Sequence, residues 1–177
     1  MSFEDLIQTG LKALDMARAH GLAVRLVVGK LDELEADITG LGGLVPRAIE
    51  TKKEAQVATA TQQERLAEGW ARVTAIRMAV KRTADAADVR KAWGIGTKSN
   101  QTSVKNVLAM IDQMVARAAS NPTEFRAAGL LSTDIDAMKA AAGAIRDADV
   151  VQEARRARAP FTTRERNLAG DRIIKSI

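Results

Sequence analysis

Apolar and small residues recur over the first forty positions at alternating spacings of four and three residues, from Phe3 to Ile38. A seam with this spacing is typical of a long amphipathic helix that packs on other helices. The pattern predicts a helix over residues 2–39, with a break near residues 20–21 as the alternative, because glycine weakens a helix there. Gly10 lies on the seam itself, which indicates a close approach of two helix axes.

Helix-breaking residues divide the pattern after that seam. Gly40-Leu41-Gly42-Gly43 predicts the end of the first helix, since glycine is common just past a helix end. Pro46 fits the first turn of a following helix, where its missing N–H costs little. We therefore predict a second helix over residues 46–83. The apolar run Leu41–Val45 would form the tip of a hairpin between the two helices.

The rest of the chain carries further start and stop signals. They predict a short helix over 85–93, a loop over 94–102, a helix over 103–119, a short helix from Pro122 to Gly129 and a helix over 132–159. Pro160 is expected to stop the last of these helices. A capping box at Thr162-Thr163-Arg164-Glu165 then predicts a final short helix that reaches Ser176.

The elements together predict an all-α fold, an antiparallel up-and-down bundle of about four long helices with short accessory helices. No run alternates in the manner of a strand. Apolar residues make up 46% of the chain but aromatic residues only 3%, so the core should consist mainly of aliphatic side chains. The two tryptophans, Trp70 and Trp93, are expected in that core. We predict a helical bundle over residues 1–159 and a basic C-terminal tail over residues 160–177 that docks or stays mobile.

The positive charge is concentrated near the C-terminus. Residues 1–150 carry 20 basic and 19 acidic side chains, whereas residues 151–177 carry 7 basic and 3 acidic ones, which together give the net charge of +5. Five arginines form the one charge cluster and are the candidate partner-binding residues: Arg155, Arg156, Arg158, Arg164 and Arg166. Such a cluster can bind the phosphates of nucleic acid or the carboxylates of an acidic partner. Favourable charge at a helix C-terminus also accounts for the first three.

Catalytic and metal-binding patterns are weak in this sequence. The chain has no cysteine, and its one histidine, His20, is predicted to lie on a helix surface without a partner. The loop Gly94–Ser99 resembles a phosphate-binding loop, but Thr97 stands where that motif requires glycine. The acidic pairs Asp134/Asp136 and Asp147/Asp149 are two residues apart and do not converge on a helix. Asp85 and Asp88 are three apart and can share a face, but two carboxylates alone are a poor cation site. We therefore predict a protein that is not an enzyme, with no cofactor and no metal.

Function is predicted to be that of a helical scaffold or adaptor that binds a protein partner or a second copy of itself. Binding of nucleic acid through the arginine cluster is one alternative. The other is a membrane-active bundle, because the apolar tip over residues 41–45 resembles that of α-helical pore-forming toxins. The tip lacks the Trp or Tyr typical of a membrane interface, which favours a buried end of the bundle. The acidic N-terminus is unlike a signal peptide, and we expect a cytoplasmic protein.

Overall fold

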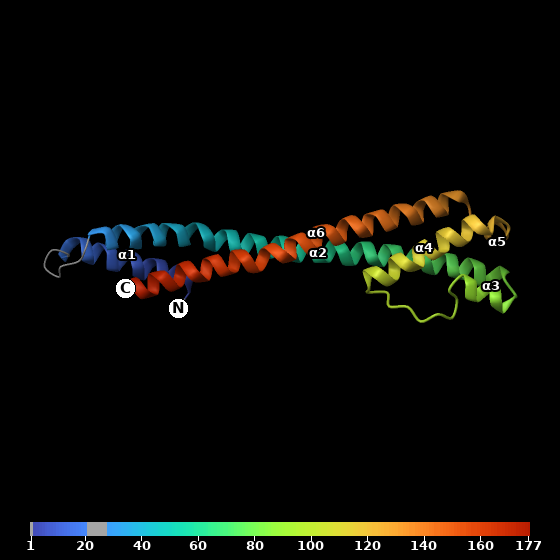
Figure 1. The fold of residues 1–177 in the computed structure, drawn as a ribbon, viewed down its shortest axis with the longest axis horizontal. Coiled ribbons are helices and arrows are strands. Elements are labelled where there is room, and N and C mark those ends of the chain that lie inside the picture. The colour runs from blue at the N-terminus through green and yellow to red at the C-terminus, as the bar shows by residue number, and fades with distance from the viewer. Residues whose placement is uncertain (1, 21–27) are drawn as a thin grey trace. The chain divides into compact units, whose positions relative to one another are not determined.

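The computed structural model describes residues 2–20 and 28–177 of the 177-residue chain. All regular elements in these ranges are helices, so the predicted all-α class is confirmed. Figure 1 shows their order along the chain: α1 (Phe3–His20), α2 (Val28–Thr83), α3 (Ala87–Ala92), α4 (Val104–Ser120), α5 (Pro122–Ala127) and α6 (Ser132–Ser176). Two of the six helices are very long, with 56 residues in α2 and 45 in α6.

The chain divides into two compact units, and both long helices contribute to each. Unit 1 consists of residues 1–56 and 154–177, and unit 2 consists of residues 57–153. Unit 1 therefore contains α1, the first half of α2 and the second half of α6. Unit 2 contains the second half of α2, the three short helices and the first half of α6.

Helix α1 of unit 1 folds back along α2. A Cβ atom on Gly10 would lie 2.9 Å from Cδ1 of Ile38 and 3.5 Å from Cγ2 of Ile173, and Arg18 pairs with Glu35. In one straight helix, residues 10 and 38 would lie about 42 Å apart. The prediction of a single unbroken helix over residues 2–39 is therefore wrong. The alternative, a break near residues 20–21, falls at the edge of residues 21–27, which lie outside the described ranges.

The predicted close approach of helix axes at Gly10 is confirmed by these distances. A second one lies at Gly170, where a Cβ atom would be 3.0 Å from Cε1 of Phe3. The small residues let the three helical segments of unit 1 enclose a shared aliphatic core. Its buried residues are Leu6, Leu14, Leu34, Ile38, Leu41, Ala169 and Ile173.

The glycine-rich segment at residues 40–43 and Pro46 do not end a helix, which corrects the predicted boundary there. Helix α2 runs through both, and Leu41 is fully buried in the core of unit 1. The free energy of burying such apolar side chains offsets the cost of about 1 kcal/mol for each helical glycine. Pro46 leaves the carbonyl of the exposed Gly42 without its usual donor, and water can reach it. The predicted hairpin tip at Leu41–Val45 is therefore wrong.

Pro160 likewise does not stop α6, so the predicted separate helix after it is wrong. The predicted capping box is wrong for the same reason. The hydroxyls of Thr162 and Thr163 donate to the carbonyl of Ala159, at 3.1 and 3.0 Å. This bonding lies within the helix, and it lets the buried Thr162 hydroxyl satisfy its donor where the chain continues past the proline. Residues 160–176 are thus the last turns of α6.

Unit 2 follows the sequence signals closely. Ser103 caps α4 by accepting from the backbone N–H of Asn106 at 3.4 Å, and Pro122 opens α5 as predicted. The predicted loop over residues 94–102 is confirmed. Trp93 is fully buried, as predicted, and stacks on Phe125 with ring centroids 6.2 Å apart.

Helix α4 runs in the same direction as α2. The residues just before α4 lie beside Gln62 and Leu66, in the middle of α2. The other end of α4 leads to Phe125, which stacks on Trp93 beyond the end of α2. Helix α6 runs antiparallel to α2, since Gln62 bonds Asp149 while Gly69 contacts Ile145. The loop before α4 therefore returns along α2, so α2 and α4 do not form the antiparallel pair that an up-and-down order requires.

Candidate functional site

The five arginines of the sequence cluster all lie on α6 within unit 1, but the structure does not bring all of them together. Arg155 donates to Glu54 of α2 at 2.6 Å. Arg166 lies over the ring of Phe3, with its guanidinium carbon 4.4 Å from the ring centroid, and also donates to Asn167. These two arginines hold α6 against α2 and α1.

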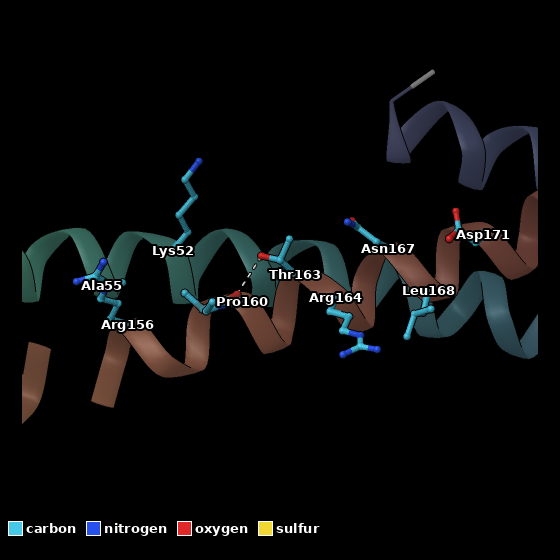
Figure 2. A pocket seen from close by; sticks show the side chains of 10 residues that line it. Lys52, Ala55, Arg156, Pro160, Thr163, Arg164, Asn167, Leu168 and Asp171 are labelled. Atoms are coloured by element: carbon cyan, nitrogen blue, oxygen red, sulfur yellow. Dashed lines mark hydrogen bonds between the residues drawn. The ribbon is translucent and has the colours of Figure 1, made fainter. Parts of the chain in front are cut away.

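Arg156 and Arg164 line a groove on unit 1, whereas the exposed Arg158 does not. The groove has a volume of about 600 Å³ and lies between α2 and α6. Figure 2 shows Lys52 extending from α2 and Arg164 from α6 to opposite sides of this view, with Pro160 between them. We call this feature the basic groove, and its lining residues are Lys52, Ala55, Arg156, Ala159, Pro160, Thr163, Arg164, Asn167, Leu168 and Asp171.

Charge in the basic groove is unbalanced. Three cations line it, Lys52, Arg156 and Arg164, and none of them forms an ion pair with a described residue. Asp171 is the one acidic residue in the lining. Some other cations of unit 1 are neutralised within the fold. Arg172, for example, pairs with Asp37 at 2.8 Å, and that carboxylate raises the pKa of the Arg172 guanidinium. The groove therefore attracts anionic groups.

The floor of the groove is made of small apolar groups. Ala55 of α2 lies across from Ala159 and Pro160 of α6, and Leu168, whose side chain is 50% exposed, lies further along. From Arg156 to Asp171 the lining covers about 22 Å of helix at 1.5 Å per residue. This combination of a long apolar floor and cationic edges suits an elongated amphipathic ligand.

Two groove residues escaped the sequence analysis for different reasons. Lys52 belongs to a polar stretch of α2, and nothing in the sequence shows that this stretch lies beside α6. By sequence, Leu168 belongs to a separate short helix, because Pro160 is expected to end the preceding helix. The neighbouring lysine-rich pattern at Lys52-Lys53 is the only local signal, and it is common on solvated helices.

Other predicted features lie where their chemistry is ordinary. His20 is exposed at the end of α1, and no group of three potential metal ligands occurs within the described ranges. Trp70 is half-buried and lines a cavity of unit 2, so its predicted place in the core is only partly correct. None of the described helices has the length and hydropathy needed to cross a membrane.

The comparisons with known proteins add no assignment. No protein-family model matches the chain, and no curated protein or solved structure is similar enough to match it.

Proposed function

We propose that this protein is a non-enzymatic helical adaptor that binds an acidic amphipathic helix of a protein partner in the basic groove. The observation that carries the proposal is a set of three cations, Lys52, Arg156 and Arg164, along an apolar floor. None of the three forms an ion pair within residues 2–20 and 28–177. Carboxylates of a partner would pair with the cations while its apolar face covers Ala159 and Leu168. Recognition by an amphipathic helix in a groove is a common mode of protein binding.

The dimensions of the groove support a helical partner. A helix of about fifteen residues spans the distance from Arg156 to Asp171. Small residues at Ala55 and Ala159 permit a close approach of helix axes, as at the glycines inside unit 1. Unit 1 consists of three helical segments. A bound helix would be the fourth, and it would give the four-helix arrangement that we propose for the working state.

The arginine chemistry favours an acidic protein over nucleic acid. Arg155 and Arg166 are engaged by Glu54 and Phe3, so fewer cations remain for phosphates than the sequence cluster contains. The groove also offers no aromatic side chain on which a base could stack. Binding of nucleic acid is therefore one of the outcomes that the test distinguishes, and self-association is another.

Site-specific photocrosslinking in the native host tests the proposal. A photoreactive residue at Asn167, which lines the groove, should capture a protein segment that is acidic and amphipathic. The same residue at Ser176, exposed on α6 outside the groove, is the control and should not capture it. A synthetic peptide with the captured sequence then allows affinities to be measured.

The peptide should bind the wild-type chain, and the double variant Arg156→Glu, Arg164→Glu should bind it at least about tenfold more weakly, because attraction becomes repulsion. Arg158→Glu carries the same charge change outside the groove and should retain the wild-type affinity within about twofold. Equal losses for Arg158→Glu and the double variant would contradict the proposal. If the chain instead binds random duplex DNA, with an affinity that falls with salt and with each Arg→Glu change, the result would favour nucleic acid as the partner. Capture of this chain's own peptides would identify self-association.

A further inference from the structure

A second cavity lies on unit 2, where the loop before α4 passes over α2. Its volume is about 510 Å³, within the range of pockets that hold small molecules. Gln62, Gln63, Leu66 and Trp70 line it from α2, and Gln101 and Thr102 line it from the loop. Ala67 and Ala71 complete the wall, and their small side chains leave the space open. We call this feature the amide cavity.

The lining of the amide cavity contains no ionisable side chain. Its polar groups are neutral amides and one hydroxyl. Gln63 and Gln101 form no hydrogen bond with a described residue, so each retains an unused amide donor and acceptor. The Gln62 amide donates one N–H to Asp149 and retains its second N–H and its carbonyl oxygen. The Thr102 hydroxyl donates to Asn100 at 2.7 Å and retains only acceptor capacity. A neutral ligand with both donors and acceptors matches this set.

The apolar part of the lining is suited to a flat ring. Leu66 is nearly fully buried, and the half-buried Trp70 provides the aromatic surface. The guanidinium of Arg77 lies over the Trp70 ring, with its central carbon 5.5 Å from the centroid. Burial lowers the pKa of Arg77, and its Nε has no hydrogen-bond partner in the described structure. Arg77 thus covers one face of the indole, and the indole also lines the cavity.

We propose that the amide cavity binds a neutral purine-type ring, with Trp70 stacking on the ring and Gln63 and Gln101 bonding its edge. Glutamine amides recognise the edge of adenine by accepting from its amino group and donating to a ring nitrogen. Stacking on an aromatic side chain contributes to binding for any base. Because no cation lines the cavity, a phosphate group on the ligand adds no affinity. The proposal concerns unit 2 and is independent of the basic groove.

Adenosine is the probe, and nuclear magnetic resonance of the two indole N–H groups is the measurement. Trp70 lines the cavity, while Trp93 is fully buried and donates to Glu124 at 3.2 Å, so the chain contains its own reference signal. Adenosine should shift the Trp70 signal in a saturable way and leave that of Trp93 in place. AMP should bind with the affinity of adenosine within about twofold, with no dependence on salt.

Two variants assign the binding to the cavity. Ala67→Leu fills the space and should weaken adenosine binding by about tenfold or more. The matched control is Ala75→Leu, the same change at an exposed position of α2 outside the lining, and it should bind as the wild type does. Gln101→Leu preserves the size of the side chain but removes the amide, and should also weaken binding by about tenfold.

Several outcomes would overturn the proposal. One is an unshifted Trp70 signal with adenosine, guanosine and caffeine at about 1 mM each. Another is binding of AMP but not of adenosine, which would reveal an anion site. Equal effects of Ala67→Leu and Ala75→Leu would place the binding elsewhere. An unchanged Trp93 signal and far-ultraviolet circular dichroism show that each variant is folded, so a loss of binding can be attributed to the cavity.

Discussion

The basic groove and the amide cavity both use α2 for one wall and small residues for their space, but their polar groups differ completely. Alanines leave the space in both: Ala55 and Ala159 in the groove, Ala67 and Ala71 in the cavity. The groove adds three cations that pair with no acidic residue in the described part of the chain, whereas the cavity adds neutral amides and half-buried Trp70. Small residues thus determine where a ligand fits, and the polar residues at the edge determine its chemical class.

The cores beneath the two sites differ as well. Unit 1 is closed by aliphatic side chains around glycines, and its ends are held by ion pairs such as Arg172–Asp37. Unit 2 contains a buried aromatic pair, Trp93 and Phe125, and a larger set of buried aliphatic residues. An extended groove therefore lies on the unit with the smaller core, and a compact cavity lies on the one with the larger core. Four predictions test this contrast.

The largest effect is expected from the aromatic core of unit 2. Trp93→Ala removes a fully buried ring and its hydrogen bond to Glu124, and should lower the free energy of unfolding by about 3–5 kcal/mol. Urea denaturation followed by far-ultraviolet circular dichroism measures this loss. Trp93→Phe, which keeps a ring beside Phe125, should lose less. If Trp93→Ala were as stable as the wild type, the aromatic pair could not be the centre of this core.

The next effect concerns glycines on the same unit that differ only in surroundings. A Cβ atom on Gly69 would lie 2.6 Å from Cδ1 of Ile145, whereas one on Gly143 would meet nothing within 4 Å. Gly69→Ala should therefore destabilise the protein by about 1–3 kcal/mol. Gly143→Ala should stabilise it by about 0.5–1 kcal/mol, because alanine favours a helix. Thermal unfolding of both variants decides the point, and equal shifts would show that Ile145 adjusts freely.

Binding at the two proposed sites should differ in its dependence on ionic strength. Raising the ionic strength from about 0.05 M to about 0.5 M should weaken binding of the acidic peptide to the basic groove by about tenfold. Adenosine in the amide cavity should lose less than about twofold over the same range, since no charged residue lines it. Titration calorimetry at both salt concentrations measures the two affinities. A similar salt response at both sites would remove the electrostatic distinction between them.

The smallest effect is at the first turn of α1. The backbone N–H of Ser2 donates to the Asp5 carboxylate at 2.9 Å, and this bond lowers the pKa of Asp5. A lowered pKa means that the contribution of the carboxylate is complete above the unfolded value of about 4 and is lost as pH falls through the folded value. Ser103, which caps α4 in unit 2, is neutral and should show no such dependence. Carbon chemical shifts of Asp5 during a pH titration test this, and an ordinary pKa would contradict it.

Helix type and many boundaries follow from local chemistry, and this is why α4 and α5 were predicted well. Ser103 caps α4 and Pro122 occupies the first turn of α5, and at neither position does burial override the local signal. Pro46 and Pro160 failed as boundary signals because tertiary burial decides there. Leu41 before the first proline and Thr162 after the second are both buried, so the helices continue through the breaks. Local signals are weak wherever a neighbouring helix provides more stabilisation.

The same error concealed the candidate site. A helix that stops at Pro160 gives no fixed relation between Arg156 and Arg164, whereas a continuous α6 places both in one groove. Arg155 and Arg156 are adjacent in the sequence, but adjacent residues on a helix point in different directions. Only Arg156 lines the groove. The contribution of Lys52 depends on which turns of α2 and α6 meet. That pairing is a tertiary fact with no local signature.

The placement of the two tryptophans has a consequence for every optical experiment on this protein. Both belong to unit 2, and the chain has no tyrosine. Absorbance at 280 nm and intrinsic fluorescence therefore report on unit 2. The three phenylalanines contribute little, so unit 1 could lose its structure while the emission spectrum stayed constant. A thermal unfolding curve of the wild-type chain recorded by fluorescence therefore follows unit 2 alone. A tryptophan introduced into unit 1 would allow the unfolding of that unit to be followed as well.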